Sequence, residues 1–197
     1  MESSATIGVM IDHFGLLAPI YDRLITPPDP ERLRELLRLP VAGVMLDAGG
    51  GTGRVSGQLR HLVGQLVISD ESSGMLRQAQ EKALCCPVAA GVERLPFGDG
   101  VFQRVLVVDA LHHFADQRRA IAELARVLAP GGRLVIEEPD LHRVAVKFIA
   151  VAEKLALMRS KFYYPHEIGQ MVADSGLRPE IVSDGGFATW IVADKRA

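Results

Sequence analysis

The feature that most constrains the fold of this chain is a glycine-rich turn between an apolar run and a helical pattern. The apolar segment 41–47 ends at Asp47, and the loop 48–53, with glycine at 49, 50, 51 and 53, follows it directly. Glycine adopts the left-handed conformations that tight turns need and leaves backbone amides open to a ligand. A strand entering such a loop and then a helix is typical of the crevice where doubly wound sheets bind nucleotides. A plain strand-to-helix turn is the alternative, although it would need fewer glycines.

Apolar strands and amphipathic helices alternate from this loop to about residue 177. The apolar runs predict strands at 41–47, 65–70, 87–92, 103–109 and 133–138, the last entered through a turn at 130–132. The helical periodicity predicts helices at 31–39, 54–63, 72–83, 117–128, 141–160 and 166–175. Two more strand-like runs, 178–184 and 187–193, flank Gly185-Gly186 and predict a hairpin. We therefore expect an α/β fold: a three-layer, doubly wound, mostly parallel sheet of seven strands with a C-terminal antiparallel hairpin.

The length and composition fit one domain. The chain has 197 residues, of which 48% are hydrophobic, and this is enough for one complete core. Residues 7–26 mix apolar and charged side chains at roughly helical spacing, and the proline-rich segment 27–30 stops that pattern. We expect a single domain over residues 1–197, with residues 1–40 as an N-terminal helical lid.

Charge and cysteine content exclude several classes of partner. A formal net charge of -2 and a pI near 6.3 give no basic surface for nucleic acid. The sequence shows no signal peptide, and no stretch reaches the roughly 18 apolar residues that a membrane-spanning helix needs. The only cysteines, Cys85 and Cys86, are adjacent, which suits neither a disulfide framework nor a zinc site. We expect a cytoplasmic protein without a metal, a nucleic-acid partner or an integral membrane segment.

The residues around the glycine loop distinguish between cofactors. A dinucleotide-binding loop needs a third small residue, but Arg54 and Ser56 stand at the two positions where it would fall. Asp47 would repel a pyrophosphate, whereas it suits the ammonium and sulfonium groups of S-adenosylmethionine. Asp70, which ends the second strand, can accept hydrogen bonds from ribose hydroxyls in either kind of cofactor. The alternatives to a methyl donor site are an NAD- or FAD-dependent oxidoreductase and a non-catalytic cofactor-binding partner domain.

Four segments resemble, in order and spacing, the motifs of class I S-adenosylmethionine-dependent methyltransferases of the UbiE-like (methyltransferase type 11) group. They are LDAGGGTGR at 46–54, ISDESSGML at 68–76, GVERLPFGDGVFQRVLVVDALHHF at 91–114 and LAPGGRLVIEEP at 128–139. The resemblance implies that the methionine end of the cofactor is held by Asp47, Gly49, Gly51 and Gly53. It also implies that Asp70 binds the ribose and that Val92 and Glu93 hold the adenine edge through backbone groups.

Two positions depart from that family pattern at the adenine end. The family commonly has an aspartate just before the position of Val92, and this chain has Gly91. The family tends to have an apolar residue after the ribose-binding acid, and this chain has Glu71. The recognition of adenine is therefore the part of the cofactor site that the resemblance specifies least.

The candidates for the reaction centre follow the fourth strand. Methyl transfer is an in-line displacement that depends on alignment and exclusion of water, and it requires a base only if the acceptor must lose a proton. Asp109, His112 and His113 are the candidate catalytic residues, with His112 the first choice for facing the acceptor. Both histidines could instead cap or pack a helix start. Tyr21 is a candidate lid over the sulfonium, or a helix residue that packs on the sheet edge.

The acceptor class follows from what this region lacks. Base-amino methyltransferases have an (Asp/Asn)-Pro-Pro-aromatic turn after the fourth strand, and here the sequence is Asp109-Ala110-Leu111-His112. The apolar N-terminal segment, which could form a pocket wall or core, would suit a greasy small molecule. We expect a small, apolar or aromatic methyl acceptor, with S-adenosylhomocysteine as the second product. The acceptor atom, the use of a base and the oligomeric state stay open.

Overall fold

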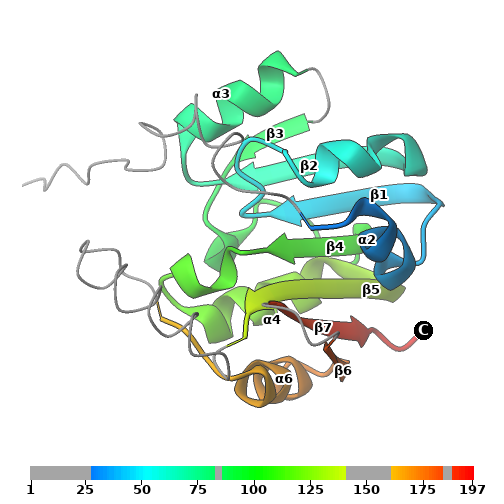
Figure 1. The fold of residues 1–197 in the computed structure, drawn as a ribbon, viewed down its shortest axis with the longest axis vertical. Coiled ribbons are helices and arrows are strands. Elements are labelled where there is room, and N and C mark those ends of the chain that lie inside the picture. Colours follow the sequence, from blue (N-terminus) through cyan, green and yellow to red (C-terminus); the bar gives the residue numbers. More distant parts are fainter. Residues whose placement is uncertain (1–27, 83–85, 141–160, 184–187) are drawn as a thin grey trace, which may run out of the picture.

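A computed structural model of the chain describes residues 28–82, 86–140, 161–183 and 188–197, and its strands form one seven-stranded sheet (Figure 1). The strands are β1 (Val41–Ala48), β2 (Val63–Asp70), β3 (Cys86–Ala89), β4 (Phe102–Val108), β5 (Leu128–Pro139), β6 (Arg178–Ser183) and β7 (Ala188–Asp194). Their order is β3-β2-β1-β4-β5-β7-β6. β1 to β5 pair in parallel, and β7 runs antiparallel to both β5 and β6. The predicted seven-stranded, mostly parallel sheet with a C-terminal hairpin is confirmed.

Helices cover the sheet on two faces, which gives the three layers that the alternating pattern predicts (Figure 1). They are α2 (Pro30–Leu37), α3 (Ser73–Glu81), α4 (Gln117–Val127) and α6 (Pro165–Asp174), with short 3-10 helices η1 (Ser56–Leu62), η2 (Val92–Arg94) and η3 (Leu111–His113). One core cluster contains buried residues of α4 and α6, and the other contains those of α2, η1 and α3. No helix in the described ranges is long and apolar enough to cross a membrane.

Side-chain caps fix where three of the helices begin. Asp29 caps α2, Ser72 caps α3 and Asp116 caps α4, each by accepting a backbone N–H of the first turn. Such a cap satisfies one of the amides that a helix start leaves without a partner. Ser72 follows β2 closely and Asp116 follows η3, so the caps fix where α3 and α4 begin beyond the strands that carry the predicted site.

The structure corrects three local predictions. The segment predicted as a helix at 54–63 forms the shorter 3-10 helix η1, because β2 already begins at Val63, where it pairs with Val41. Val92 lies in η2 rather than in the third strand, which ends at Ala89. The predicted turn at 130–132 is an irregularity inside β5, where the pairing with β4 shifts register and Gly131 has a φ of 72°.

Part of the N-terminal prediction lies outside the described residues. The helical segment 7–26, with Tyr21, and the helix predicted at 141–160 are not described. The described part of the proposed lid, α2, packs on the core through Leu33, Leu36 and Leu37, all of which are buried. The lid over residues 1–40 therefore stays a prediction.

The sheet places its topological switch point at β1. The neighbours of β1 are β2 on one side and β4 on the other, and the chain leaves β1 through the glycine loop. In doubly wound sheets, ligands bind outside the carboxyl ends of the strands at such a point. The loops after β1, β2 and β4 and the carboxyl end of β5 meet at this edge, which is called the carboxyl edge below.

Candidate functional site

The glycine loop after β1 is shaped by three left-handed residues. Gly49, Gly51 and Gly53 have φ values of 70°, 55° and 69°, a region that residues with a side chain rarely adopt. A Cβ on Gly49 would lie 2.9 Å from the Cβ of Ala110, and one on Gly53 would lie 2.6 Å from Cδ1 of Ile68. Gly49 and Gly53 therefore allow the loop to pack tightly against the loop after β4 and against β2.

Gly51 differs from the other two because a Cβ there would make only ordinary contacts and no collision with a described residue. A Cβ there would meet only Sδ of Met75 at 3.9 Å and Oδ2 of Asp70 at 4.0 Å. The backbone N–H of Gly51 donates a hydrogen bond of 2.9 Å to that same Asp70 oxygen. The other Asp70 oxygen accepts the N–H of Ser72 at 2.8 Å. The two predicted cofactor-binding features, the glycine loop and the acid ending β2, thus form one hydrogen-bonded unit.

Asp47 lies beneath the loop and is 2% exposed. Its Oδ2 has no hydrogen-bond partner among the described residues, and a side chain on Gly50 would collide with it. Burial raises the pKa of Asp47 from 3.8 to about 6; the Ser56 hydroxyl opposes this rise, Asp70 adds to it and Arg54 opposes it. Because a buried carboxylate oxygen without a partner is costly, Asp47 would gain from a donor group or a cation brought to the loop.

These features fit the group that the sequence predicts. An ammonium group supplies the donors and the positive charge that the Asp47 oxygen lacks. Because Gly51 has no side chain, a ligand could approach its backbone where a Cβ would otherwise project toward Met75 and Asp70. A carboxylate such as Asp70, whose two oxygens together offer about four acceptor sites, can accept further hydrogen bonds from vicinal hydroxyls. The residues present therefore match the methionine and ribose ends of S-adenosylmethionine.

The predicted adenine end is built from η2 and the residues around it. Val92 is buried, and its neighbour Glu93 is tied to α4, because Oε1 of Glu93 accepts the N–H of Asp116 at 3.2 Å. The carbonyl of Glu93 also accepts a hydrogen bond from Nε of Arg119 at 3.1 Å. Both groups of Glu93 thus have structural partners within the protein.

Gly91 and Glu71, the two positions that depart from the family pattern, lie together in space. A Cβ on Gly91 would lie 2.5 Å from Oε1 of Glu71 and 3.2 Å from Oε2 of Glu93. Burial raises the pKa of Glu71, and the negative charges of Glu93 and Asp70 raise it further. The Glu71 carboxyl therefore fills the space that a side chain at position 91 would take.

The three candidate catalytic residues follow β4 at the same edge. Asp109 has a left-handed φ of 52°, and its N–H donates to the carbonyl of Glu137 at 3.0 Å. His112 is 3% exposed, and its ring lies 4.0 Å from the ring of His113. Burial and the neighbouring His112 lower the pKa of His113 from 6.5 to about 3. A non-glycine residue held at positive φ close to the buried His112 is the kind of local strain that accompanies functional sites.

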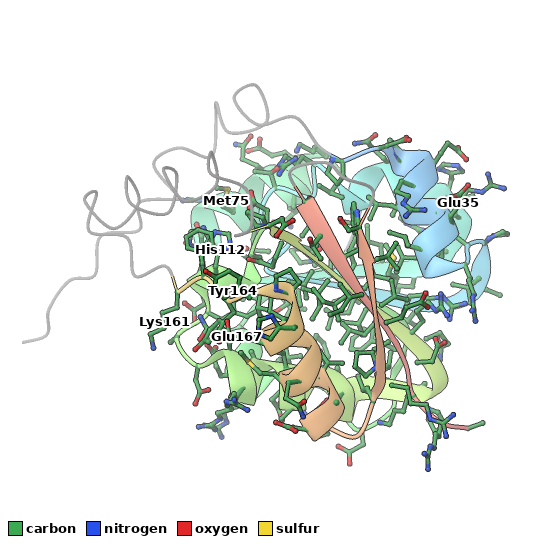
Figure 2. All side chains as sticks on the ribbon, turned by 60° about the horizontal axis from the view of Figure 1, so that its bottom comes forward. Glu35, Met75, His112, Lys161, Tyr164 and Glu167 are labelled. Carbon is green, nitrogen blue, oxygen red and sulfur yellow. The ribbon has the colours of Figure 1, made fainter. Side chains whose placement is uncertain are left out.

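The sequence reasoning left Glu138 without a role, and the structure places it against His112. Oε2 of Glu138 lies 2.7 Å from Nδ1 of His112, and Oε1 accepts the N–H of Leu111 at 2.8 Å. Glu138 is itself only 4% exposed. Figure 2 shows His112 beside the segment of Lys161 and Tyr164, and the N–H of Lys161 donates to the His112 carbonyl at 2.8 Å.

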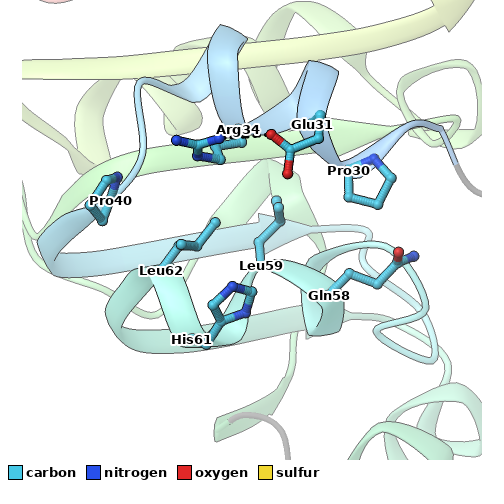
Figure 3. A pocket seen from close by; sticks show the side chains of 8 residues that line it. All are labelled: Pro30, Glu31, Arg34, Pro40, Gln58, Leu59, His61 and Leu62. Carbon is cyan, nitrogen blue, oxygen red and sulfur yellow. Dashed lines mark hydrogen bonds and ion pairs between the residues drawn. The ribbon is translucent and has the colours of Figure 1, made fainter.

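A separate hollow of about 390 Å³ lies between α2 and η1 (Figure 3). Its lining consists of Pro30, Glu31, Arg34, Pro40, Gln58, Leu59, His61 and Leu62. Pro40 and Leu62 immediately precede β1 and β2, so the hollow lies toward the amino ends of these strands. None of the predicted site residues lines it. In the described ranges no group of three or more His, Cys, Asp or Glu residues could hold a metal ion.

Comparison with known proteins agrees with this geometry. Residues 46–136 match the model of a methyltransferase domain family. The chain is 38% identical over 105 residues to a demethylmenaquinone methyltransferase of Mycobacterium marinum, covering 53% of this chain and 45% of the relative. It is 29% identical to a ubiquinone/menaquinone biosynthesis C-methyltransferase UbiE of Yersinia enterocolitica, covering 91% of this chain and 83% of the relative.

Solved structures share the fold at lower identity. The YcgJ protein of Bacillus subtilis superposes with a TM-score of 0.75 at 19% identity, covering 85% of this chain and 98% of that one. A SAM-dependent methyltransferase from Aquifex aeolicus superposes with a TM-score of 0.69 at 21% identity, covering 92% of this chain and 96% of that one.

The matches concentrate on the part of the chain that carries the site. This chain spans about half the length of the Mycobacterium marinum relative, and the family model begins at Leu46 and ends at Ile136. That range contains the glycine loop, Asp70, η2 and the residues that follow β4. The fold, the ordered motifs and these relatives support a class I S-adenosylmethionine-dependent methyltransferase similar to the UbiE group.

Proposed function

We propose that this protein transfers a methyl group from S-adenosylmethionine to a small molecule, with S-adenosylhomocysteine as the second product. The observation that carries the proposal is the hydrogen-bonded unit of the glycine loop and Asp70, above an Asp47 oxygen that has no hydrogen-bond partner in the part of the chain that the structure describes. When bound, S-adenosylmethionine supplies an electrophilic methyl carbon on a positively charged sulfur. The chain's own residues would bind, orient and shield the reacting groups.

Each predicted residue has a role in this proposal. Asp47 and the glycines at 49, 51 and 53 would hold the methionine end, and Asp70 would hold the ribose hydroxyls. Val92 and Glu93 would lie at the adenine edge. Val92 is buried there, and the side-chain carboxyl and main-chain carbonyl of Glu93 already accept hydrogen bonds from α4 and its cap. Tyr21 would close over the donor as part of the N-terminal lid.

The acceptor would bind beside the residues that follow β4. Asp109, His112 and His113 are the candidates for contact with it, and they lie next to the glycine loop because Gly49 abuts Ala110. We propose a small, apolar or aromatic acceptor, in line with relatives whose names refer to demethylmenaquinone, ubiquinone and menaquinone. Positioning and exclusion of water can supply roughly 7 to 11 kcal/mol of catalysis in such displacements. We also propose a cytoplasmic location.

Binding measurements test this function against its two alternatives. Wild-type protein is titrated with S-adenosylhomocysteine and with NADH, and melting is followed for each, because a ligand that binds the folded state raises the melting temperature. Methyl transfer is then measured with S-adenosylmethionine carrying a tritiated methyl group and with reduced 1,4-naphthoquinone as the acceptor. Stabilisation by NADH alone would favour an oxidoreductase. Binding of S-adenosylhomocysteine without transfer to any of a panel of phenols, amines and thiols would favour a non-catalytic partner domain.

A further inference from the structure

The chain ends of β2 and β3 bring a glutamate against a glycine. The N–H of Ala90 donates to the carbonyl of Asp70 at 3.1 Å, and the hydroxyl of Ser69 donates to the carbonyl of Ala90 at 3.2 Å. These two hydrogen bonds fix the chain just before Gly91 against the end of β2. Glu71, the residue after Asp70, lies beside Gly91, and a Cβ on Gly91 would be only 2.5 Å from Oε1 of Glu71.

The missing side chain of Gly91 leaves the room that the Glu71 carboxyl takes. Gly91 has a φ of -73° and an extended conformation, which any residue can adopt. Its backbone therefore does not require a glycine. What excludes a side chain in the present arrangement is the carboxyl group itself, because a Cβ essentially never lies within 3.0 Å of another heavy atom. Gly91 and Glu71 thus form a matched pair, in which the carboxyl comes from position 71.

The Glu71 carboxyl has no donor in the part of the chain that the structure describes. Its side chain is exposed, so a ligand can reach it. Desolvation raises the pKa of Glu71, the negative charges of Glu93 and Asp70 raise it further, and no hydrogen bond or cation of the described residues opposes the rise. Oε2 of Glu93 lies 3.2 Å from the same Cβ position of Gly91, so two carboxyl groups flank this point. An N–H donor brought there would lower the repulsion between them.

A metal ion is one possible occupant of the space between these carboxyl groups. Within the described ranges, however, no group of three or more His, Cys, Asp or Glu residues could hold a metal ion. Glu93 is also partly engaged, since its Oε1 accepts the N–H of Asp116 at 3.2 Å. The Glu71 carboxyl is therefore the acceptor that is left for an N–H group of an organic ligand.

The proposed cofactor has such an N–H group at its adenine end. The buried Asp47 oxygen without a partner among the described residues lies at the methionine end of the site, and Asp70 lies at the ribose. Glu71 directly follows Asp70 in the chain, so it lies where the site continues past the ribose. Adenine carries a donor, the 6-amino group, beside the acceptor N1 on its Watson–Crick edge, and both are missing in this form from 6-oxo purines.

We infer that Glu71 is a specificity-determining residue of the cofactor site, whose carboxylate accepts a hydrogen bond from the 6-amino group of adenine in the space that Gly91 leaves free. This inference rests on the proposed function. It assigns the recognition of adenine, which the family resemblance leaves least specified, to a side chain at one of the two positions where this chain departs from the family pattern.

A carboxylate at this point would discriminate strongly between purines. An ionised carboxylate only accepts hydrogen bonds, and so does the oxygen of a 6-oxo purine. Replacing the amino group with an oxygen therefore turns two acceptors toward each other and leaves both without a donor. A site that is built to bond a donor rejects analogues without it by large factors. The adjacent negative charge of Glu93 adds to the rejection.

Three variants isolate the role of the Glu71 carboxylate. Glu71→Gln keeps the shape of the side chain, but its amide can present either an oxygen or an NH2 group, so it suits both kinds of purine. Glu71→Ala removes the acceptor and vacates the space beside Gly91. Adding Gly91→Asp to E71A supplies a carboxyl from the other side of that space, because the Cβ of position 91 points toward the present Oε1 of Glu71. Glu81→Gln is the matched control, because Glu81 is also exposed and lies at the far end of α3.

The experiment is calorimetric titration of the full chain with S-adenosylhomocysteine and with S-inosylhomocysteine, its 6-oxo analogue, in buffer that contains EDTA. We expect wild type and E81Q to prefer S-adenosylhomocysteine by about 10²-fold and E71Q to bind the two ligands within about threefold of each other. E71A should bind S-adenosylhomocysteine about tenfold more weakly than wild type does, and E71A/G91D should recover a preference of at least about tenfold. Ligand-free E71Q and E71A should melt with wild type, since no described residue donates to this carboxyl.

The same titrations separate the failure of this inference from the failure of the proposed function. If folded wild type binds neither ligand, the proposed function is wrong, and this inference is wrong with it. If wild type binds S-adenosylhomocysteine but does not prefer it to the 6-oxo analogue, only this inference is wrong. The same conclusion follows if E71Q keeps the wild-type preference, or if E71A/G91D discriminates no better than E71A.

Discussion

The backbone N–H of Gly51 donates a 2.9 Å hydrogen bond to Oδ2 of Asp70, so the loop after β1 and the acid that ends β2 hold one another in place. The same carboxylate accepts the N–H of Ser72, the residue that caps α3. A ligand that binds Asp70 therefore meets an acceptor whose orientation is already fixed. Fixing such groups before binding reduces the ordering cost of association.

Gly51→Ala should weaken cofactor binding more than it destabilises the fold. The new methyl group projects toward Met75 and Asp70, where the cofactor would lie. The left-handed conformation costs an alanine about 1 to 2 kcal/mol of folding free energy. We expect the affinity for S-adenosylhomocysteine to fall more than about tenfold by calorimetry. Gly131→Ala is the matched control, since Gly131 also has a positive φ, 72°, and nothing within 4 Å of its Cβ position. Equal affinities of the two variants would contradict the placement of the cofactor at Gly51.

Asp70→Asn should impair both the loop and the binding of the cofactor. An amide offers only one oxygen, so it cannot accept the N–H groups of Gly51 and Ser72 in the present geometry. Leaving a backbone donor of this kind without a partner costs about 1 to 3 kcal/mol, which denaturant unfolding would detect. The affinity for S-adenosylhomocysteine should fall with it. Asp29→Asn, at the cap of α2, is the control and should leave the affinity for S-adenosylhomocysteine unchanged. If D70N binds S-adenosylhomocysteine with wild-type affinity, Asp70 does not contact the cofactor.

Asp47→Asn should make the ligand-free protein more stable at neutral pH and lower its affinity for the cofactor. Because the pKa of Asp47 is about 6 in the folded protein and 3.8 as its ordinary value, the folded state holds the proton more tightly than the unfolded state does. Wild-type stability from this group is therefore full below about pH 4 and is lost as the pH rises through 6. At one pKa unit per 1.36 kcal/mol, the gain of D47N at pH 7.5 is about 3 kcal/mol.

Two measurements check this prediction for Asp47. Urea unfolding of wild type and D47N is compared at several pH values, and the difference in unfolding free energy should shrink toward zero as the pH falls below 4. Titration with S-adenosylhomocysteine at pH 7.5 should show weaker binding to D47N, since the ammonium loses its counter-charge. If the difference in unfolding free energy stays constant across pH, the pKa of Asp47 is not raised in the folded protein.

Lys195→Met should destabilise the fold without touching the site. The ammonium group of Lys195 donates to the carbonyls of Ala125 and Leu128, each at 2.7 Å, and so ties the chain after β7 to the end of α4. Removing this donor leaves carbonyls at a helix terminus without their partner, which costs about 1 to 3 kcal/mol. The melting temperature should fall, and the affinity for S-adenosylhomocysteine should stay at the wild-type value. A loss of affinity in K195M would show that this contact acts on the carboxyl edge.

The parts of the fold that the sequence predicted depend on local patterns. Period and length of the apolar runs identified all seven strands, and the glycine pair at 185–186 located the hairpin between β6 and β7. The errors arose where tertiary pairing overrides a local pattern. β2 starts at Val63 and takes residues from the expected helix, and β5 continues through Gly131 because its flanking residues pair with β4.

The candidate site was predicted only as far as its residues are close in sequence to a strand end. Asp47 and Asp70 end recognisable strands and His112 follows one, so their common edge could be predicted. The partner of His112 could not be predicted, because Glu138 is 26 residues away in the sequence. Nothing in the sequence distinguishes it from the adjacent Glu137, whereas in the structure Glu138 is the more buried of the two. Similarly, nothing local indicates that Glu71 fills the space beside Gly91.

Calorimetric titration of the wild-type protein with S-adenosylhomocysteine, repeated with G51A and G131A and with NADH as the competing ligand, tests the central claim most directly. The account predicts that wild type and G131A bind one S-adenosylhomocysteine per chain, that G51A binds it more than about tenfold more weakly, and that NADH does not compete. A folded wild-type protein that gives no heat with S-adenosylhomocysteine, or that binds NADH in its place, would contradict the claim that the glycine loop is a methyl donor site.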